Sequence, residues 1–358
     1  MKNQEHKQAK QQINAYTNKP HKFQPKLEFE ERMNKILELN GGDEKDKQEF
    51  WKIVHIEPNN SIRCNTLKIS PKELKQKLEA KGWKIKQPFN EYKEIMIIET
   101  QLGPGEIGRS KEHLLGYYYV QEISSMLPIL ALKPTEDDNF LDLCASPGSK
   151  TTQAAAMMEN KGNIIANEPN LGRMVILASN LEKCGVSNTI ITRRDGVRFC
   201  KEIKKTMMFD KILVDAPCSG EGTLRSSPHT FLSWNIKSVE NMSMQQKVLA
   251  ASAIEALKED GEMIYSTCTH APEENEEIVQ FLLDNYNIKL EEIKLPSELK
   301  TREGLANWKD KIFSKEINKC IRIYPQDNDT EGFFLCKIRK LSEKIQDTEE
   351  VNEENDEI

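Results

Sequence analysis

The chain has 358 residues, of which 37% are hydrophobic and 30% charged, and its formal net charge is -6. This length allows a full core and predicts two domains with terminal tails. The longest apolar stretch, Met126 to Leu132, is interrupted by Pro128, and the Lys- and Gln-rich start lacks a signal-peptide core. We therefore expect neither a membrane span nor secretion.

The eight cysteines include no CxxC motif and no paired spacing. Such a distribution fits neither a zinc site nor a disulfide framework, so we expect no metal and a reducing, cytoplasmic location. Taken singly, most of these cysteines are interpreted as packing residues. This interpretation applies to Cys144, Cys184, Cys200, Cys320 and Cys336.

The two ends of the chain differ strongly in charge. Residues 1–27 carry six Lys and one Glu, whereas residues 341–358 carry eight acidic side chains and one Lys. Both ends are predicted to be disordered, as a basic tail and an acidic tail. The bulk charge of the body between them does not indicate nucleic-acid binding, so any case for RNA depends on local features.

Residues 28–125 are predicted to form a small α/β domain of the RRM-like type that binds RNA. A helical apolar pattern from Phe29 ends at Gly41-Gly42. We then expect a strand from Ser61 to Leu67, a helix from the capping box Ser70-Pro71-Lys72-Glu73 to Gly82, and a strand from Ile95 to Glu99. Arg63 and Lys68 suit a sheet that grips RNA, although no aromatic stacking pair is found.

From Asn139 onward, buried strands alternate with helices, which is typical of a parallel sheet covered on both faces. The predicted strands are Asn139 to Leu143, Asn163 to Asn167, Thr189 to Thr192, Lys211 to Val214 and Glu262 to Ser266. Residues 126–340 are therefore predicted to form a Rossmann-like domain. Ligands of such sheets lie beyond the carboxyl ends of the strands.

Small and acidic residues follow the first three of these strands. Asp142 to Lys150 form a small-residue turn that lets a ligand approach the backbone. Glu168 follows the second strand, where a carboxylate can bind ribose hydroxyls, and Asp195 follows the third. Neither GxxxxGK[ST] nor GxGxxG is present, so a nucleoside cofactor without a phosphate loop is indicated, and S-adenosylmethionine is the candidate.

Two cysteines follow the last two predicted strands. Cys218 lies in Asp215-Ala216-Pro217-Cys218-Ser219-Gly220, and Cys268 lies in Tyr265-Ser266-Thr267-Cys268-Thr269. Carbon 5 of cytosine is too poor a nucleophile to accept a methyl group until a thiolate adds to carbon 6. One thiol can attack while another helps to release the product, so the pair indicates covalent chemistry on a pyrimidine.

Other classes of protein explain these cysteines less well. A thiol protease would use Cys268 with His270, but both lie on one turn and no orienting Asn is found. A DNA cytosine methyltransferase would use Pro217-Cys218, but the second cysteine and the N-terminal domain argue against it. A non-catalytic RNA-binding scaffold would be expected to lack Cys268 or Asp215, and both are intact.

The stretches around Cys144, Glu168, Asp195, Asp215 and Cys268 resemble the NOL1/NOP2/Sun family of RNA 5-methylcytosine methyltransferases. The resemblance extends from Ile62 to Lys340. It includes Arg63-Cys64-Asn65-Thr66-Leu67, Tyr119-Val120-Gln121-Glu122, Pro272-Glu273-Glu274-Asn275-Glu276 and Glu331-Gly332-Phe333-Phe334. The stretch from His113 to Leu132 is similar to archaeal members, which implies tRNA as the substrate, with ribosomal RNA as the alternative. We expect the protein to be a monomer.

The resemblance also implies roles for individual residues. Cys268 is the implied nucleophile and Cys218 the implied release residue, while Asp215 contacts the cytosine and Lys150 positions Asp215 or the base. The implied cofactor site comprises Cys144, Ala145, Ser146, Pro147, Gly148, Ser149, Lys150, Glu168, Arg173, Asp195 and Asp215. Family members usually have Ala at the position of Ser146 and Gly at that of Ser149, so we expect altered cofactor affinity at most.

Overall fold

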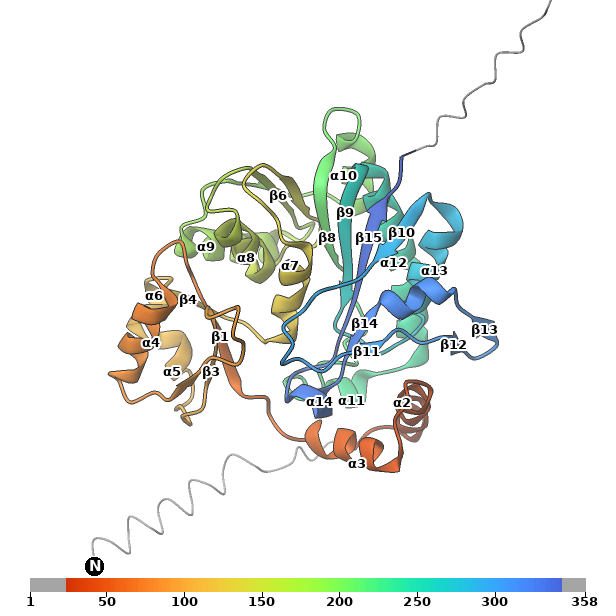
Figure 1. Cartoon of the computed structure of the whole chain (residues 1–358), viewed down its shortest axis with the longest axis horizontal. Helices are drawn as coiled ribbons and strands as arrows, with labels where there is room; N and C mark the ends of the chain where they lie inside the picture. The colour runs from red at the N-terminus through yellow and green to blue at the C-terminus, as the bar shows by residue number, and fades with distance from the viewer. Residues whose placement is uncertain (1–23, 343–358) are drawn as a thin grey trace, which may run out of the picture.

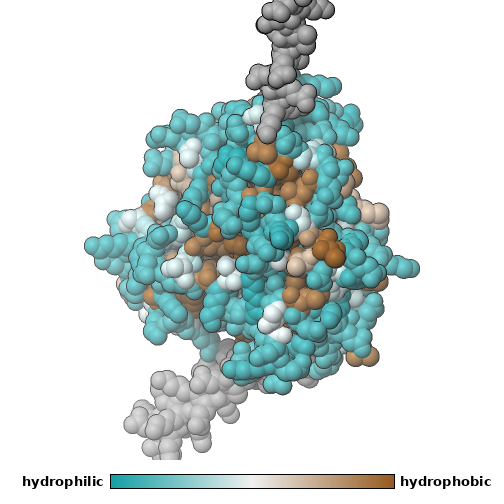
Figure 2. Space-filling model, turned by 45° about the vertical axis from the view of Figure 1, so that its right-hand side comes forward, coloured by the Kyte–Doolittle hydropathy of each residue, from teal (hydrophilic) through white to brown (hydrophobic). Residues whose placement is uncertain are grey.

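A computed structural model describes residues 24–342 of the chain. The predicted disordered tails therefore lie almost wholly outside the described residues. Within residues 24–342, no helix is long and apolar enough to cross a membrane. Hydrophilic residues cover most of the face shown in Figure 2, and hydrophobic residues appear there in smaller groups.

The N-terminal part begins with two helices and continues into a small sheet. Its elements are α2 (Leu27–Leu39), α3 (Glu44–Ile53), β1 (Asn60–Cys64), α4 (Pro71–Glu79), β2 (Ile85–Lys86), β3 (Ile95–Ile98), α5 (Glu106–Arg109), α6 (Lys111–Leu114) and β4 (Tyr118–Val120). The sheet has the order β2-β3-β1-β4, and its neighbouring strands are antiparallel. This is the β-α-β-β-α-β arrangement of ferredoxin-like domains, in agreement with the RRM-like prediction.

Helix α4 begins where the sequence predicts it. The Ser70 side chain accepts a hydrogen bond from the backbone N–H of Glu73, and the Glu73 carboxylate accepts one from the N–H of Ser70. These contacts satisfy two amides that the first helical turn leaves free, and Pro71 follows at the first helical position. Local residue chemistry is enough to start this helix.

The small sheet is packed on two sides. On one side, Ile62 and Met96 share a buried cluster with Leu74 of α4. Arg63 points to the other side and donates hydrogen bonds to the carbonyl of Ser149, at 2.7 Å, and to Thr152 Oγ1, at 2.8 Å. Arg63 is therefore buried between the small sheet and α8 (Ser149–Met157), a helix of the second part of the chain. This burial corrects its interpretation as an RNA-contacting residue.

The second part of the chain builds the large sheet. Its helices are η1 (Ser124–Met126), α7 (Leu127–Leu132), α8 (Ser149–Met157), α9 (Leu171–Cys184), α10 (Gly196–Ile203), α11 (Thr230–Ser233), α12 (Ile236–Ala256), α13 (Glu276–Asn285), η2 (Lys315–Lys319) and α14 (Pro325–Asn328). Its strands are β5 (Asn139–Asp142), β6 (Asn163–Asn167), β7 (Thr189–Thr192), β8 (Phe209–Asp215), β9 (Leu257–Thr267), β10 (Ile288–Glu291), β11 (Arg302–Glu303), β14 (Ile321–Ile323) and β15 (Phe333–Lys340). A separate hairpin joins β12 (Asn307–Trp308) to β13 (Lys311–Ile312).

The large sheet has the order β11-β14-β15-β9-β8-β5-β6-β7, with β10 paired to β15. Strands β5 to β9 are parallel, and β15 runs antiparallel to β9. The chain moves outward from β5 to β7 and then returns to place β8 on the other side of β5. This reversal is the topological switch point at which α/β sheets bind ligands. The predicted Rossmann-like fold and its five parallel strands are confirmed.

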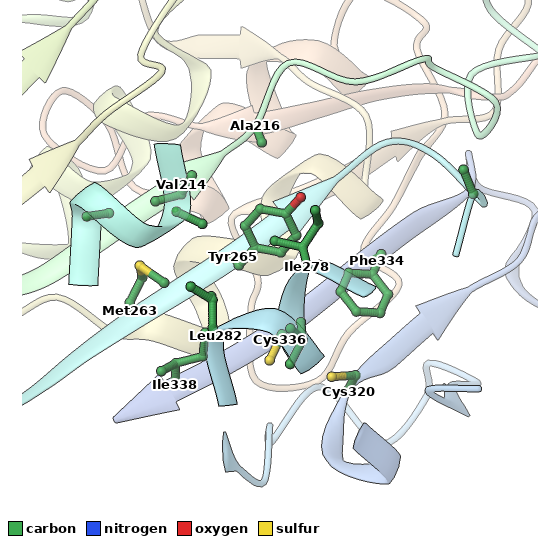
Figure 3. Close-up of a cluster of buried hydrophobic side chains, with 14 of the residues drawn as sticks. Val214, Ala216, Met263, Tyr265, Ile278, Leu282, Cys320, Phe334, Cys336 and Ile338 are labelled. Atoms are coloured by element: carbon green, nitrogen blue, oxygen red, sulfur yellow. The ribbon is translucent and has the colours of Figure 1, made fainter. Parts of the chain in front are cut away.

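Helices cover both faces of the large sheet (Figure 1). Helices α7 and α8 enclose one apolar cluster, and α10, α12 and α13 enclose the other. Figure 3 shows part of the second cluster, where Tyr265, Met263 and Ile338 of the sheet meet Ile278 and Leu282 of α13. The turns that carry the predicted site residues extend from this rigid layer.

Helices α2 and α3 lie beneath the large sheet, away from the small one (Figure 1). The Phe29 ring is 5.1 Å from that of Trp234 and 6.2 Å from that of Phe231. Arg302 binds Asp46 of α3 at 2.6 Å. These two helices therefore belong to the same hydrophobic cluster as the large sheet, while the division of the chain at residue 125 stays a prediction.

Candidate active site

A cavity of about 600 Å³ lies beyond the carboxyl ends of the parallel strands. Because neighbouring parallel strands end at the same edge, residues far apart in the sequence meet there. Eight residues predicted for the site line this cavity: Cys144, Ser146, Glu168, Arg173, Asp195, Asp215, Cys218 and Cys268. Its volume is in the range of small-molecule and cofactor sites.

The turn between β5 and α8 forms one wall of the cavity. Gly148 has a φ of +102°, and a Cβ there would lie 3.0 Å from Cδ1 of Leu177, so the turn requires glycine. Ser146 Oγ donates to the carbonyl of Arg173 at 2.9 Å, and the Arg173 guanidinium donates back to the carbonyl of Ser146. An alanine could not make the first bond, so Ser146 fastens this turn to α9.

Five predicted residues of this turn are absent from the lining of this cavity, and one of them, Lys150, lines a second cavity described below. The other four are Ala145, Pro147, Gly148 and Ser149. Their backbone shapes the turn instead: the carbonyl of Ser149 accepts from Arg63, and that of Pro147 accepts from Asn180 of α9 at 2.8 Å. These backbone contacts hold the wall in place, and contact of the four residues with a cofactor stays a prediction.

Glu168 follows β6 and is only 2% exposed. One carboxylate oxygen accepts from the backbone N–H of Asn170 at 2.8 Å, and the other lies 3.5 Å from Nε of Arg173. Asp195 follows β7 and caps α10 by accepting from the N–H of Arg198 at 2.9 Å. Two carboxylates at consecutive strand ends fit the hydroxyl and amino groups of a nucleoside.

Cys218 and Cys268 follow the neighbouring strands β8 and β9. Their sulfur atoms lie 3.2 Å apart, within hydrogen-bonding distance. The hydrogen bond to Cys268 and burial both raise the pKa of Cys218 well above its usual value. Cys218 therefore keeps its proton, and either sulfur can be the donor of the hydrogen bond between them.

The backbone around Cys268 is also fixed. The N–H of Gly222 donates to the Cys268 carbonyl at 2.9 Å. A Cβ at position 222 would lie 2.8 Å from that carbonyl oxygen and 2.4 Å from the carbonyl oxygen of Gly332. Only glycine lets the loop after Cys218 approach Cys268 so closely.

Asp215 lies beside the cysteine pair and is held at both carboxylate oxygens. Lys150 Nζ is 2.7 Å from Oδ2, and Ser266 donates to Oδ1 at 2.8 Å. Lys150 also donates to Ser125 Oγ at 2.8 Å and lies 5.6 Å from the centre of the Phe333 ring. The Asp215 carboxylate is thereby oriented before any substrate arrives.

A second cavity, of about 360 Å³, meets the first at Asp215 and Cys268. Its walls come from the small sheet, through Ser61 and Val120, and from the start of β15, through Phe333. The two residues that line both cavities thus lie where two ligands could meet. Neither this second cavity nor its position is visible in the sequence.

Several lining residues were missed by the sequence analysis. Helix α12 supplies one wall of the first cavity through Met244, Gln246, Val248 and Leu249. Their positions carry no motif, because the face of a helix that meets a cavity is decided by packing. The strand-end residues, in contrast, were found because every parallel strand of this sheet ends at the same edge.

Comparisons with known proteins agree with this geometry. Residues 129–339 match the family model of the 16S rRNA methyltransferase RsmB/F, and residues 26–123 match that of the N-terminal domain of 16S rRNA methyltransferase RsmF. A tRNA (cytosine(49)-C(5))-methyltransferase of Pyrococcus abyssi is 42% identical over 88% of this chain and 98% of its own length. The ribosomal RNA small subunit methyltransferase F of Vibrio cholerae is 39% identical over 79% of this chain, but the match spans 58% of that longer protein.

Solved structures also resemble this chain over most of its length. A methyltransferase homologue from Pyrococcus horikoshii has a TM-score of 0.73 at 32% identity and covers 87% of this chain and 99% of its own. The NSun6 protein of the same organism, solved with SFG, has a TM-score of 0.73 at 25% identity, covering 87% of this chain and 97% of its own.

A Rossmann-like sheet with carboxylates after β6 and β7, and without a phosphate-binding glycine loop, defines an S-adenosylmethionine-dependent methyltransferase. The match over residues 129–339 and the 42% identity to a nearly full-length relative narrow the class further. The chain belongs to the RsmB/F family of methyltransferases, and the resemblance to NOL1/NOP2/Sun proteins is confirmed.

Proposed function

We propose that this chain methylates carbon 5 of a cytosine in RNA, with tRNA as the substrate. The observation that carries the proposal is the Cys218–Cys268 pair, 3.2 Å apart, beside Asp215 at the junction of two cavities. Support for tRNA comes from the Pyrococcus abyssi relative, whose match spans 98% of that protein. Ribosomal RNA is the second candidate, since the Vibrio relative matches over 58% of its length.

In the proposed reaction, Cys268 attacks carbon 6 of the cytosine, forming a carbon–sulfur bond and moving electron density to carbon 5. Asp215, oriented by Lys150 and Ser266, holds the base through its ring nitrogen 3 and exocyclic amine. S-adenosylmethionine supplies the methyl group that carbon 5 accepts. A base stacked in a helix cannot reach these groups, so the target must be unpaired or flipped out.

Release requires a base for the proton on carbon 5, and we propose Cys218. The hydrogen bond to Cys268 is the largest cause of its raised pKa. Once Cys268 is a neutral thioether, this hydrogen bond raises the pKa of Cys218 less, so Cys218 can pass its proton to water and become a thiolate. Cys218 then takes the proton from carbon 5, the carbon–sulfur bond breaks, and the Cys268 thiolate returns.

We also propose that the enzyme acts as a monomer in the cytoplasm. One chain supplies every residue named above in both cavities. The proposed reaction needs two free thiols, which a reducing compartment preserves.

A methylation assay with defined substrates tests the proposal. The purified chain would receive labelled S-adenosylmethionine with a tRNA transcript, a 16S rRNA fragment or a DNA oligonucleotide, followed by bisulfite mapping. We expect 5-methylcytosine in tRNA, and none with Cys268→Ala. Methylation of the rRNA fragment alone would favour the second candidate. Methylation that persists in Cys268→Ala would refute the covalent route.

A further inference from the structure

The residues on both sides of Cys218 are held by two buried side chains. Gln246 Nε2 donates to the carbonyl of Pro217 at 2.7 Å and to Oε2 of Glu274 at 2.8 Å. The same Glu274 oxygen accepts from the backbone N–H of Ser219 at 3.0 Å. Glu274 and Gln246 therefore fix the backbone immediately before and after Cys218.

The residues on both sides of Cys268 are held in the same manner by one side chain. Thr267 Oγ1 donates to Oδ1 of Asn275 at 2.6 Å. Asn275 Nδ2 in turn donates to the carbonyl of Thr269 at 3.0 Å. Asn275 thus uses both ends of its amide to hold the two neighbours of Cys268, Thr267 through its hydroxyl and Thr269 through its carbonyl.

Glu274 and Asn275 are consecutive residues, and both are 0% exposed. Ser219 and Thr269, which follow the two cysteines, also share a hydrogen bond of 2.9 Å between their hydroxyl oxygens. One short segment thus ties the two cysteine loops to each other, although the cysteines are fifty positions apart. Buried polar networks of this kind restrict the conformations that their members can adopt.

The buried carboxyl group of Glu274 lowers the stability of the fold. Burial raises its pKa to about 7, and its Oε1 has no hydrogen-bond partner in the described part of the chain. An unpaired buried polar atom destabilises a fold. The charge of Glu274 also contributes to the raised pKa of Cys218. A core residue selected for packing alone would not carry this group.

We propose that Glu274 and Asn275 are positioning residues with separate tasks: Glu274 places Cys218 for release, and Asn275 places Cys268 for attack. The inference depends on the proposed cytosine methylation. It goes beyond that function because it assigns release to Glu274 and attack to Asn275, two consecutive residues in the segment Pro272 to Glu276. Misplacement of a reacting group by about 1 Å is enough to slow a step about 100-fold.

Single-turnover reactions with a tRNA transcript and S-adenosylmethionine test the two tasks separately. Denaturing gels would follow the protein–RNA adduct, and label transfer would follow product. For Glu274→Ala, we expect adduct formation near the wild-type rate and release slowed at least about tenfold, so that adduct accumulates. For Asn275→Ala, we expect adduct formation slowed at least about tenfold without accumulation.

Conservative variants separate positioning from folding. Glu274→Gln keeps an acceptor oxygen for Ser219 and Gln246, so we expect it to restore most of the release rate. Gln246→Ala removes the hydrogen bond to Pro217 and leaves the bonds of Asn275 in place, so we expect adduct to accumulate. This variant tests the release step even if Glu274→Ala does not fold. Glu277→Gln is the matched control, because its carboxylate binds Lys311 at 2.5 Å and is not part of this network.

The outcomes distinguish this inference from the proposed function. If wild type makes no adduct or product on any RNA, the proposed function itself fails. If wild type is active but the Glu274 and Asn275 variants slow both steps by the same factor, or behave like Glu277→Gln, the separate tasks are refuted. Melting temperatures of all variants would be measured first, so that only folded proteins are compared.

Discussion

The chain contains two pairs of neighbouring cysteines in opposite surroundings. Cys218 and Cys268 are partly exposed and line the first cavity at the strand ends. Cys320 and Cys336 are 0% exposed and lie in the apolar cluster of which Figure 3 shows a part. Both pairs include an internal hydrogen bond that contributes to a raised pKa, at Cys218 in one and at Cys320 in the other.

Because the direction of the pKa shift is the same in both pairs, acidity does not separate them. The first pair is flanked by hydroxyl, amide and carboxylate groups that fix its backbone, and a cavity reaches its sulfur atoms. The second pair belongs to the same buried apolar cluster as Ile278, Leu282 and Phe334, and neither cysteine is exposed. Access and polar support, rather than the thiol itself, make a cysteine useful for catalysis.

The strongest test of this contrast is covalent trapping. Cys218→Ala should accumulate protein joined to RNA, because the methylated adduct lacks its release residue. Cys268→Ala should form no adduct and no product, since nothing attacks carbon 6. A labelled tRNA transcript on a denaturing gel would show the adduct as a slow band. Cys320→Ala and Cys336→Ala are the controls and should turn over normally. A slow band with Cys268→Ala would instead make Cys218 the nucleophile and Cys268 the release residue.

Alkylation should separate the pairs without any RNA. Iodoacetamide reaches a cavity-lining sulfur directly, whereas Cys320 and Cys336 react only when the core opens. We expect the first pair to react at least about 100-fold faster, as measured by peptide mass spectrometry. Comparable rates for all four thiols would show that the core opens readily, and the contrast in access would be lost.

Cofactor binding should protect only the catalytic pair from alkylation, because that pair shares its cavity with Glu168. In Glu168→Ala, the ribose loses a charged acceptor worth about 1.5 to 3 kcal/mol. The S-adenosylmethionine concentration for half protection should therefore rise about tenfold or more. Calorimetry would check the affinity directly, and Glu182→Ala, an exposed change on α9, should leave it unchanged. An unaltered affinity in Glu168→Ala would remove Glu168 from the cofactor site.

The free energy of unfolding should be more sensitive to substitution in the buried pair than in the catalytic pair. Cys320→Ala leaves a small void in a closed apolar cluster and should lower the free energy of unfolding by about 1 to 2 kcal/mol. Cys218→Ala empties space beside a cavity that already exists, so its cost should stay below about 1 kcal/mol. Urea denaturation of the two variants would measure the difference. A larger loss in Cys218→Ala would mean that the catalytic pair also holds the fold together.

Residue patterns along the chain were enough to predict the parallel strands and the edge at which ligands bind. Strands β6 and β7 have the predicted bounds because their apolar runs end at polar residues. Glu168, Asp195, Cys218 and Cys268 could be singled out because each follows such a run. Their assembly at one cavity then follows from the parallel direction of the strands.

The sequence by itself determined the five parallel strands, the capping box of α4 and the chemical types of residue at the strand ends, since these depend on neighbours in the chain. Only the tertiary structure decided that Arg63 joins the two sheets, that α2 and α3 pack beneath the large sheet, and that a second cavity meets the first at Asp215 and Cys268. The tertiary structure also decided the hydrogen bonds of Glu274 and Asn275 to the two cysteine loops. The Arg63 bonds, the cavity junction and the Glu274 bonds join residues that lie tens of positions apart, so they exist only once the strand order has brought those residues together.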